Sequence, residues 1–202
     1  MVVYETAMTI APARPAPLSL PNMLTYGRIA AVPALVACLY FLKGDVARWS
    51  AFGLFVLAGI TDWLDGYLAR AWEQQSTLGA MLDPIADKLL VGAALMMLVY
   101  DGTIGQVSIW AAVIILCREI LVSGLREFLA ELNVKVRVSM LAKWKTTVQM
   151  VALAALLVSP AAEKYVPSLE MIGITLLWLA AVLTLWTGYD YLKAGVKHAI
   201  SH

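Results

Sequence analysis

The sequence predicts an all-α integral membrane protein with six transmembrane helices. Of its 202 residues, 61% are hydrophobic and only 14% are charged, and the mean hydropathy is +0.78. A soluble domain is nearer half apolar, with about a quarter of its residues charged. The apolar residues also fall into six stretches, most of them near the length of about 20 residues that crosses a bilayer.

Charged and turn-forming residues separate these apolar stretches. We expect spans at residues 23–42, 49–69, 79–100, 107–129, 145–158 and 168–192. The fifth stretch is short for a span unless it begins earlier, and Pro160 and Pro167 are expected to separate it from the sixth. Residues 1–20 are rich in proline and are expected to form a cytosolic tail, while residues 21–202 form one membrane domain.

Lysine and arginine lie mainly on the side of the membrane that carries both termini and the connections after the second and fourth spans. Only Lys43, Arg48 and Lys164 fall on the other side. Because cytoplasmic loops are enriched in Lys and Arg, we expect both termini to face the cytosol. The net charge is only +1, which gives no basic field to bind nucleic acid.

Four aspartates lie at the facing ends of the second and third spans. Asp62 and Asp65 are spaced i,i+3, and Asp83 and Asp87 are spaced i,i+4, so each pair shares one helix face. A short polar connection makes the two helices antiparallel neighbours, which puts both pairs at one depth near the cytoplasmic end. Each ionised group at membrane depth costs about 2.5–3.5 kcal/mol, so we expect hard divalent cations to neutralise the cluster.

Small residues beside the aspartates support a ligand site rather than a set of unrelated charges. Gly66, Ala69 and Gly79 lie close to the acidic faces, and small residues let a ligand approach the helix backbone. The alternative is that the aspartates are helix-end charges facing water, with Asp83 complementing a helix dipole. The regular spacing of the set favours the metal site.

The set reads Asp62-x2-Asp65-Gly66-x2-Ala69-Arg70-x8-Gly79-x3-Asp83-x3-Asp87. This pattern resembles the signature of the CDP-alcohol phosphotransferase family at every fixed position. The resemblance implies a six-helix membrane protein, usually a homodimer, with a polar cavity open to the cytosol. It also implies a transferase that needs Mg²⁺ or Mn²⁺, with two ions expected. Such enzymes move a phosphatidyl or similar group from a CDP-linked donor to an alcohol and release CMP.

The resemblance also implies a role for each matching residue. Asp62, Asp65 and Asp83 would be metal ligands, and Asp87 would be a ligand or neighbour of the metals and the general base. The residues implied to bind the CDP part of the donor, besides these first three aspartates, are Asn22, Thr25, Gly66, Ala69, Arg70, Ser76, Thr77 and Gly79. Arg70 would contact the diphosphate. Asn22 could equally cap the first helix, and the two roles are compatible.

Further segments resemble the bacterial members of the family that use sn-glycerol 3-phosphate as acceptor. They are residues 20–29, 118–127 and 143–149. Arg118 and Arg126 are about two helical turns apart and are expected to face the same way, and guanidinium groups suit phosphate oxygens. The residues expected to bind the acceptor phosphate are Arg118, Ser123, Arg126, Lys143 and Lys145. The alternative is that Glu119 and Glu127 pair with these basic residues and that the loop lysines set topology.

Together these features imply transfer of a phosphatidyl group from CDP-diacylglycerol to glycerol 3-phosphate, in contact with membrane lipid, in the bacterial cytoplasmic (inner) membrane. A sibling enzyme with another acceptor, such as serine or inositol phosphate, is a first alternative, although an uncharged acceptor would not need Arg118 and Arg126 together. A divalent-cation transporter is a second. Transporters usually carry inverted repeats, and the sequence shows no repeat.

Overall fold

The computed structural model describes residues 20–71, 77–131 and 140–200, and within these ranges the chain is helical without strands. The helices are α1 (Leu20–Phe41), α2 (Gly44–Ala71), α3 (Thr77–Tyr100), α4 (Ile109–Glu131), α5 (Met140–Ala162) and α6 (Leu169–Ile200), with a short 3₁₀ turn at Gln106–Ser108 before α4. Each helix coincides with one predicted apolar stretch, which confirms the all-α class.

Helix α5 is longer than the sequence predicted, and it continues through Pro160. The proline ring removes the N–H that would bond the carbonyl of Leu156. The hydroxyl of Ser159 donates to that carbonyl at 3.1 Å instead. Because the lost backbone bond is replaced in this way, the prediction that Pro160 separates the fifth and sixth helices was wrong.

Four helices in the described part of the chain are long and apolar enough to cross a bilayer. The stretches are Met23–Phe41 in α1, Gln106–Ala130 covering α4, Trp144–Ala162 in α5 and Leu169–Tyr189 in α6. Large apolar side chains such as Trp110 and Trp186 are exposed on their outer surfaces. Several such helices with apolar outer faces are typical of a multi-pass membrane protein.

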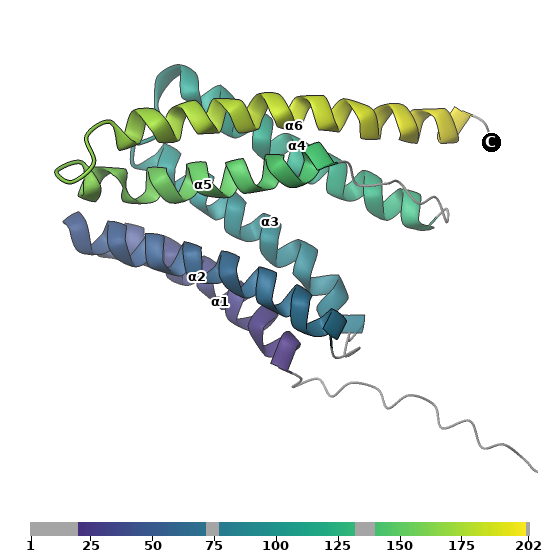
Figure 1. Ribbon diagram of the computed structural model, residues 1–202, viewed down its shortest axis with the longest axis horizontal. Helices are drawn as coiled ribbons and strands as arrows, with labels where there is room; N and C mark the ends of the chain where they lie inside the picture. The colour runs from purple at the N-terminus through teal and green to yellow at the C-terminus, as the bar shows by residue number, and fades with distance from the viewer. Residues whose placement is uncertain (1–19, 72–76, 132–139, 201–202) are drawn as a thin grey trace, which may run out of the picture.

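The helices form an antiparallel bundle around an apolar core that includes Leu98, Ile115 and Leu156 (Figure 1). Helix α5 packs along α6, α4 also packs on α6, and α2 packs on α5. The start of α1 and the C-terminal ends of α2, α4 and α6 lie towards the same end of the bundle, at the right of Figure 1. This common end is where the predicted carboxylates are located.

The contact between α2 and α3 differs from the sequence expectation. The two helices were expected to be direct neighbours, but they touch over a small area, and α1 packs extensively against both. Helix α1 brings a cation, Arg28, to Asp62 on α2 and a hydroxyl, Thr25, to Asp83 on α3.

The opposite end of the bundle is held by two ion pairs. Nη1 of Arg48 on α2 lies 2.9 Å from Oδ2 of Asp101, just after α3. Nζ of Lys164, in the connection between α5 and α6, lies 3.0 Å from Oδ2 of Asp45. The hydrogen bond to Asp45 raises the pKa of Lys164. Gly102 has φ of +81°, which suits the turn that follows α3.

Candidate active site

Three of the four predicted carboxylates come together at one end of the bundle. Asp62 lies on α2, and Asp83 and Asp87 lie on α3. Asp83 and Asp87 are close enough to Asp62 that both repel its carboxylate. The side chain of Asp62 is 50% exposed and that of Asp87 is 29% exposed, so both remain open to a ligand.

Helix α1 contributes the groups that offset this negative charge. Nη1 of Arg28 lies 2.6 Å from Oδ1 of Asp62, and the arginine side chain is only 1% exposed. One turn earlier, the hydroxyl of Thr25 donates to Oδ1 of Asp83 at 2.5 Å. Thr25 was predicted to bind the donor, but Arg28 was not singled out as a site residue. Its signal in the sequence was a charged residue inside an apolar helix, where such residues are usually functional.

A cavity of about 480 Å³ opens beside the carboxylates. Arg28, Asp62 and Asp87 form its charged part, and Thr146 and Thr147 of α5 add hydroxyl groups. The rest of its wall is apolar and comes mainly from α2 and α5, with Phe55, Val56, Ala58, Gly59, Ile60, Leu90, Met150, Val151 and Ala154. The cavity therefore combines a charged end with an apolar wall.

Carboxylate oxygens suit a hard divalent cation, but the described side chains do not surround one. No group of three Asp, Glu, His or Cys side chains within the described ranges is arranged to hold a metal. Asp62 and Asp83 instead contact Arg28 and Thr25. Carboxylate oxygens are the ligands that Mg²⁺ and Mn²⁺ prefer. Asp62 and Asp87 are partly exposed, so their oxygens are accessible to an ion from solvent.

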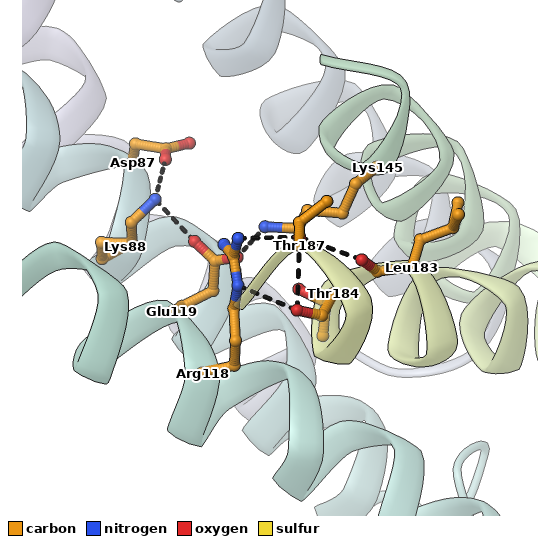
Figure 2. A network of polar contacts seen from close by, with 8 residues as sticks. All are labelled: Asp87, Lys88, Arg118, Glu119, Lys145, Leu183, Thr184 and Thr187. Carbon is orange, nitrogen blue, oxygen red and sulfur yellow. Dashed lines mark hydrogen bonds and ion pairs between the residues drawn. The ribbon is translucent and has the colours of Figure 1, made fainter. Parts of the chain in front are cut away.

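A chain of ion pairs runs from Asp87 away from the carboxylates (Figure 2). The ammonium of Lys88 lies 2.8 Å from Oδ2 of Asp87 and 2.7 Å from Oε2 of Glu119 on α4. Glu119 is 5% exposed. Its second oxygen accepts a hydrogen bond from Lys145 of α5. The chain thus connects α3 to α4 and α5 through one buried carboxylate.

Arg118 joins the same network from α4 and fixes it to α6 (Figure 2). Its Nη1 lies 3.3 Å from Oε1 of Glu119, its Nε donates to the carbonyl of Thr184 at 3.1 Å, and its Nη2 donates to the hydroxyl of Thr187 at 2.9 Å. Gly188 allows this close approach, because a Cβ there would lie 3.2 Å from Cγ of Arg118. The alternative pairing of Glu119 with basic residues is therefore present in the structure.

The sequence comparisons agree with the carboxylate pattern. Residues 18–186 match the family model for CDP-alcohol phosphatidyltransferase. The chain belongs to the CDP-alcohol phosphatidyltransferase family.

Relatives within this family share most of the chain. One from Rickettsia bellii is 47% identical over 180 residues, covering 89% of this chain and 97% of the relative. One from Haemophilus influenzae is 42% identical over 177 residues, covering 87% and 92%. One from Cereibacter sphaeroides is 37% identical, covering 89% and 96%. All three are named CDP-diacylglycerol--glycerol-3-phosphate 3-phosphatidyltransferase.

The residues predicted to bind the acceptor phosphate differ from one another in burial. Lys145 is buried beside Glu119 and Arg118 is largely buried against α6, whereas Arg126 is exposed. Ser123 is half-buried on α4. A separation of eight residues is about 2.2 helical turns, so the second arginine is rotated away from the first. The structure brings Arg118 and Lys145 together but leaves Arg126 apart from them.

Part of the family signature lies outside the described residues. Gly79 is buried near the start of α3. The side chains outside the description are those of Asn22, Asp65, Gly66, Ala69, Arg70, Ser76, Thr77 and Lys143, together with the tail of residues 1–19. The roles assigned to them remain predictions.

Proposed function

We propose that the protein transfers the phosphatidyl group of CDP-diacylglycerol to sn-glycerol 3-phosphate, giving phosphatidylglycerophosphate and CMP. The observation that carries this proposal is the convergence of Asp62, Asp83 and Asp87, of which Asp62 and Asp87 line one cavity. Three family relatives that share most of the chain bear the name of this activity. The product places the protein in phospholipid biosynthesis.

In this proposal all six helices cross the bacterial cytoplasmic membrane, including α2 and α3. Both termini and the carboxylate end then face the cytosol, where glycerol 3-phosphate is available. The support is the concentration of Lys and Arg on that side and the location of both described chain ends at one end of the bundle. The homodimer implied by the family resemblance is also part of the proposal.

Asp62, Asp65, Asp83 and Asp87 would hold Mg²⁺ or Mn²⁺ at this end. A bound divalent metal would neutralise the donor diphosphate and the charge that develops on the leaving CMP. Arg28 and Lys88 lie against the same carboxylates, at 2.6 Å from Asp62 and 2.8 Å from Asp87 respectively. These two cations would keep the carboxylates oriented while the donor enters.

Asp87 is the proposed general base. It lines the cavity, and its ion pair with Lys88 fixes one of its two oxygens. The carboxylate would accept the proton of the C1 hydroxyl of glycerol 3-phosphate. That oxygen would attack the phosphorus that carries diacylglycerol, and the bond from this phosphorus to the CMP oxygen would break. The transfer would be direct, without a covalent enzyme intermediate.

The acceptor would be oriented through its phosphate by Arg118 and Lys145, which meet at Glu119. Ser123, Arg126 and Lys143 remain predicted contacts for this phosphate. Within the described network, Lys145 and Arg118 are connected to Asp87 through Glu119 and Lys88. If the phosphate of glycerol 3-phosphate lies near Lys145, the C1 hydroxyl of the same molecule would lie on the side of Asp87. Such orientation lowers the entropic part of the barrier.

The direct test is CMP release by the purified protein supplied with CDP-diacylglycerol and one alcohol at a time. We expect rapid release with sn-glycerol 3-phosphate and only background release with serine, inositol phosphate or no acceptor. Release with a different alcohol alone would identify a sibling activity. Uptake of divalent cations into vesicles without CMP release with any alcohol would support the transporter instead.

The apolar wall of the cavity predicts where part of the diacylglycerol lies. Gly59 lines this wall, and a Cβ added there would lie 3.1 Å from Cε of Met150. Gly59→Leu should occupy part of the space that the lipid would fill and raise the KM for CDP-diacylglycerol roughly tenfold, which corresponds to a loss of about 1.4 kcal/mol of binding free energy. The matched control is Gly53→Leu on the same helix, because no neighbouring atom lies within 4 Å of its added Cβ. Equal KM values for CDP-diacylglycerol in the two variants would show that the lipid does not contact this wall.

A further inference from the structure

We infer that Glu119 is a positioning residue whose carboxylate holds Lys145, next to Arg118, for the phosphate of the acceptor. This inference rests on the proposed function and deepens it. The sequence indicated Glu119 only as an ion-pair partner of nearby basic residues. It does not touch the reacting atoms. It acts through the side chains that it holds.

Glu119 contacts three cationic side chains rather than one. Both carboxylate oxygens are used, with Oε2 lying 2.7 Å from Lys88 and Oε1 contacting both Lys145 and Arg118. The three cations come from three different helices, α3, α5 and α4. A buried carboxylate shared by three helices fixes the relative positions of the cations it joins (Figure 2).

Lys145 depends on this carboxylate more than Arg118 does. The guanidinium of Arg118 is also held by the Thr184 carbonyl and the Thr187 hydroxyl on α6. The side chain of Lys145 is 4% exposed, and Glu119 is its only ion-pair partner among the residues that the structure describes. A buried ammonium without a partner is costly, so the contact with Glu119 is what holds the end of the Lys145 side chain in place.

The charge balance of the network leaves room for an anion. Lys88, Arg118 and Lys145 outnumber Asp87 and Glu119 by one positive charge in the described network. Glu119 thus offsets part of the charge of the three cations that contact it, and a phosphate beside Lys145 and Arg118 would offset more of it. Arg118 and Lys145 lie on the α4–α5 side of Asp87.

The test compares Glu119→Gln, Lys145→Met and the double variant with wild type in steady-state assays that vary each substrate separately. Glu119→Gln keeps the side-chain shape and removes the charge. Its KM for glycerol 3-phosphate should rise at least about tenfold, as expected for loss of a charged hydrogen bond, while its KM for CDP-diacylglycerol stays within about twofold. Glu127→Gln is the matched control, since Glu127 is exposed two turns later on the same helix, and it should behave as wild type.

The double variant separates positioning from general support of the fold. If Glu119 acts through Lys145, Glu119→Gln in the Lys145→Met background should raise the acceptor KM less than about twofold further. Fully multiplicative effects would overturn the inference, as would an unchanged acceptor KM in Glu119→Gln. A parallel rise of both KM values with a lowered Tm would also overturn it, because a residue that only supports the fold would act on both substrates.

Equilibrium binding of glycerol 3-phosphate to each purified protein keeps the inference distinct from the proposed function. Binding to wild type that Glu119→Gln weakens, without CMP release from wild type, supports the inference and contradicts the function. CMP release by wild type, with equal binding of glycerol 3-phosphate by wild type and Glu119→Gln, supports the function and contradicts the inference. Should Glu119→Gln fail to fold, Glu119→Asp retains the charge with a shorter reach. It should still raise the acceptor KM selectively, and a rise in the donor KM instead contradicts the inference.

Discussion

A protein with Asp87 replaced by asparagine should bind CDP-diacylglycerol as wild type does and yet turn over about 10² to 10⁴ times more slowly. Asparagine has nearly the same shape as aspartate but cannot accept the proton of the acceptor hydroxyl. Asp87 lines the cavity and lies 2.8 Å from Lys88, so its replacement by asparagine removes one carboxylate from the site. Single-turnover CMP release and donor binding measure the two effects separately.

Asp101→Asn is the matched control for this variant. Asp101 is also ion-paired, to Arg48 at 2.9 Å, but it lies after α3 at the opposite end of the bundle. Its variant should retain the wild-type rate. A near-normal rate in Asp87→Asn would exclude Asp87 as the base, and a loss of donor binding equal to the loss of rate would assign it to metal or donor binding alone.

Replacing Arg28 with methionine should lower CMP release by about 10²-fold. The buried guanidinium contacts Asp62 at 2.6 Å, and without it Asp62 is left facing the carboxylates of Asp83 and Asp87. The displacement of one carboxylate by about 1 Å is enough for a loss of this size. The free energy of unfolding should fall by less than the roughly 3–5 kcal/mol of a fully buried pair, because Asp62 is half exposed.

Arg48→Met tests whether this loss belongs to the site. Arg48 is another largely buried arginine paired with an aspartate, with exposed fractions of 16% and 19% for the two side chains. Its removal should lower the Tm in the same way but leave CMP release by the folded protein near the wild-type rate. Similar activity in the two variants would show that Arg28 has no particular connection to the reaction.

Periodicity and spacing in the sequence predicted much of the fold and the acidic end of the site. The six helices followed from the apolar stretches, and Asp62, Asp83 and Asp87 lie near one another as expected. The face that Asp62 was expected to share with Asp65 stays a prediction, because the Asp65 side chain lies outside the description. These features depend on local geometry, which the sequence carries directly. The extension of α5 through Pro160 could not be predicted this way, because it depends on the single side-chain hydrogen bond from Ser159 to Leu156.

The partners of the charged residues were harder to predict. Arg28 and Asp62 are far apart in the chain, as are Glu119 and Lys145, and which of them meet depends on how the helices pack. The position of α1 against both α2 and α3 brings Arg28 to the carboxylates, and the packing of α4 against α6 gives Arg118 its contacts there. An arginine or glutamate inside an apolar helix indicates that a partner exists, but it does not identify that partner.

Metal dependence of the reaction tests the central claim, that the carboxylates of α2 and α3 hold divalent cations for phosphatidyl transfer. CMP release from CDP-diacylglycerol and glycerol 3-phosphate should be measured on the purified protein before and after EDTA treatment, and again after Mg²⁺ or Mn²⁺ is restored. We expect EDTA to abolish release and either added ion to recover it. An undiminished rate in EDTA, with the chelator in large excess, would contradict the claim.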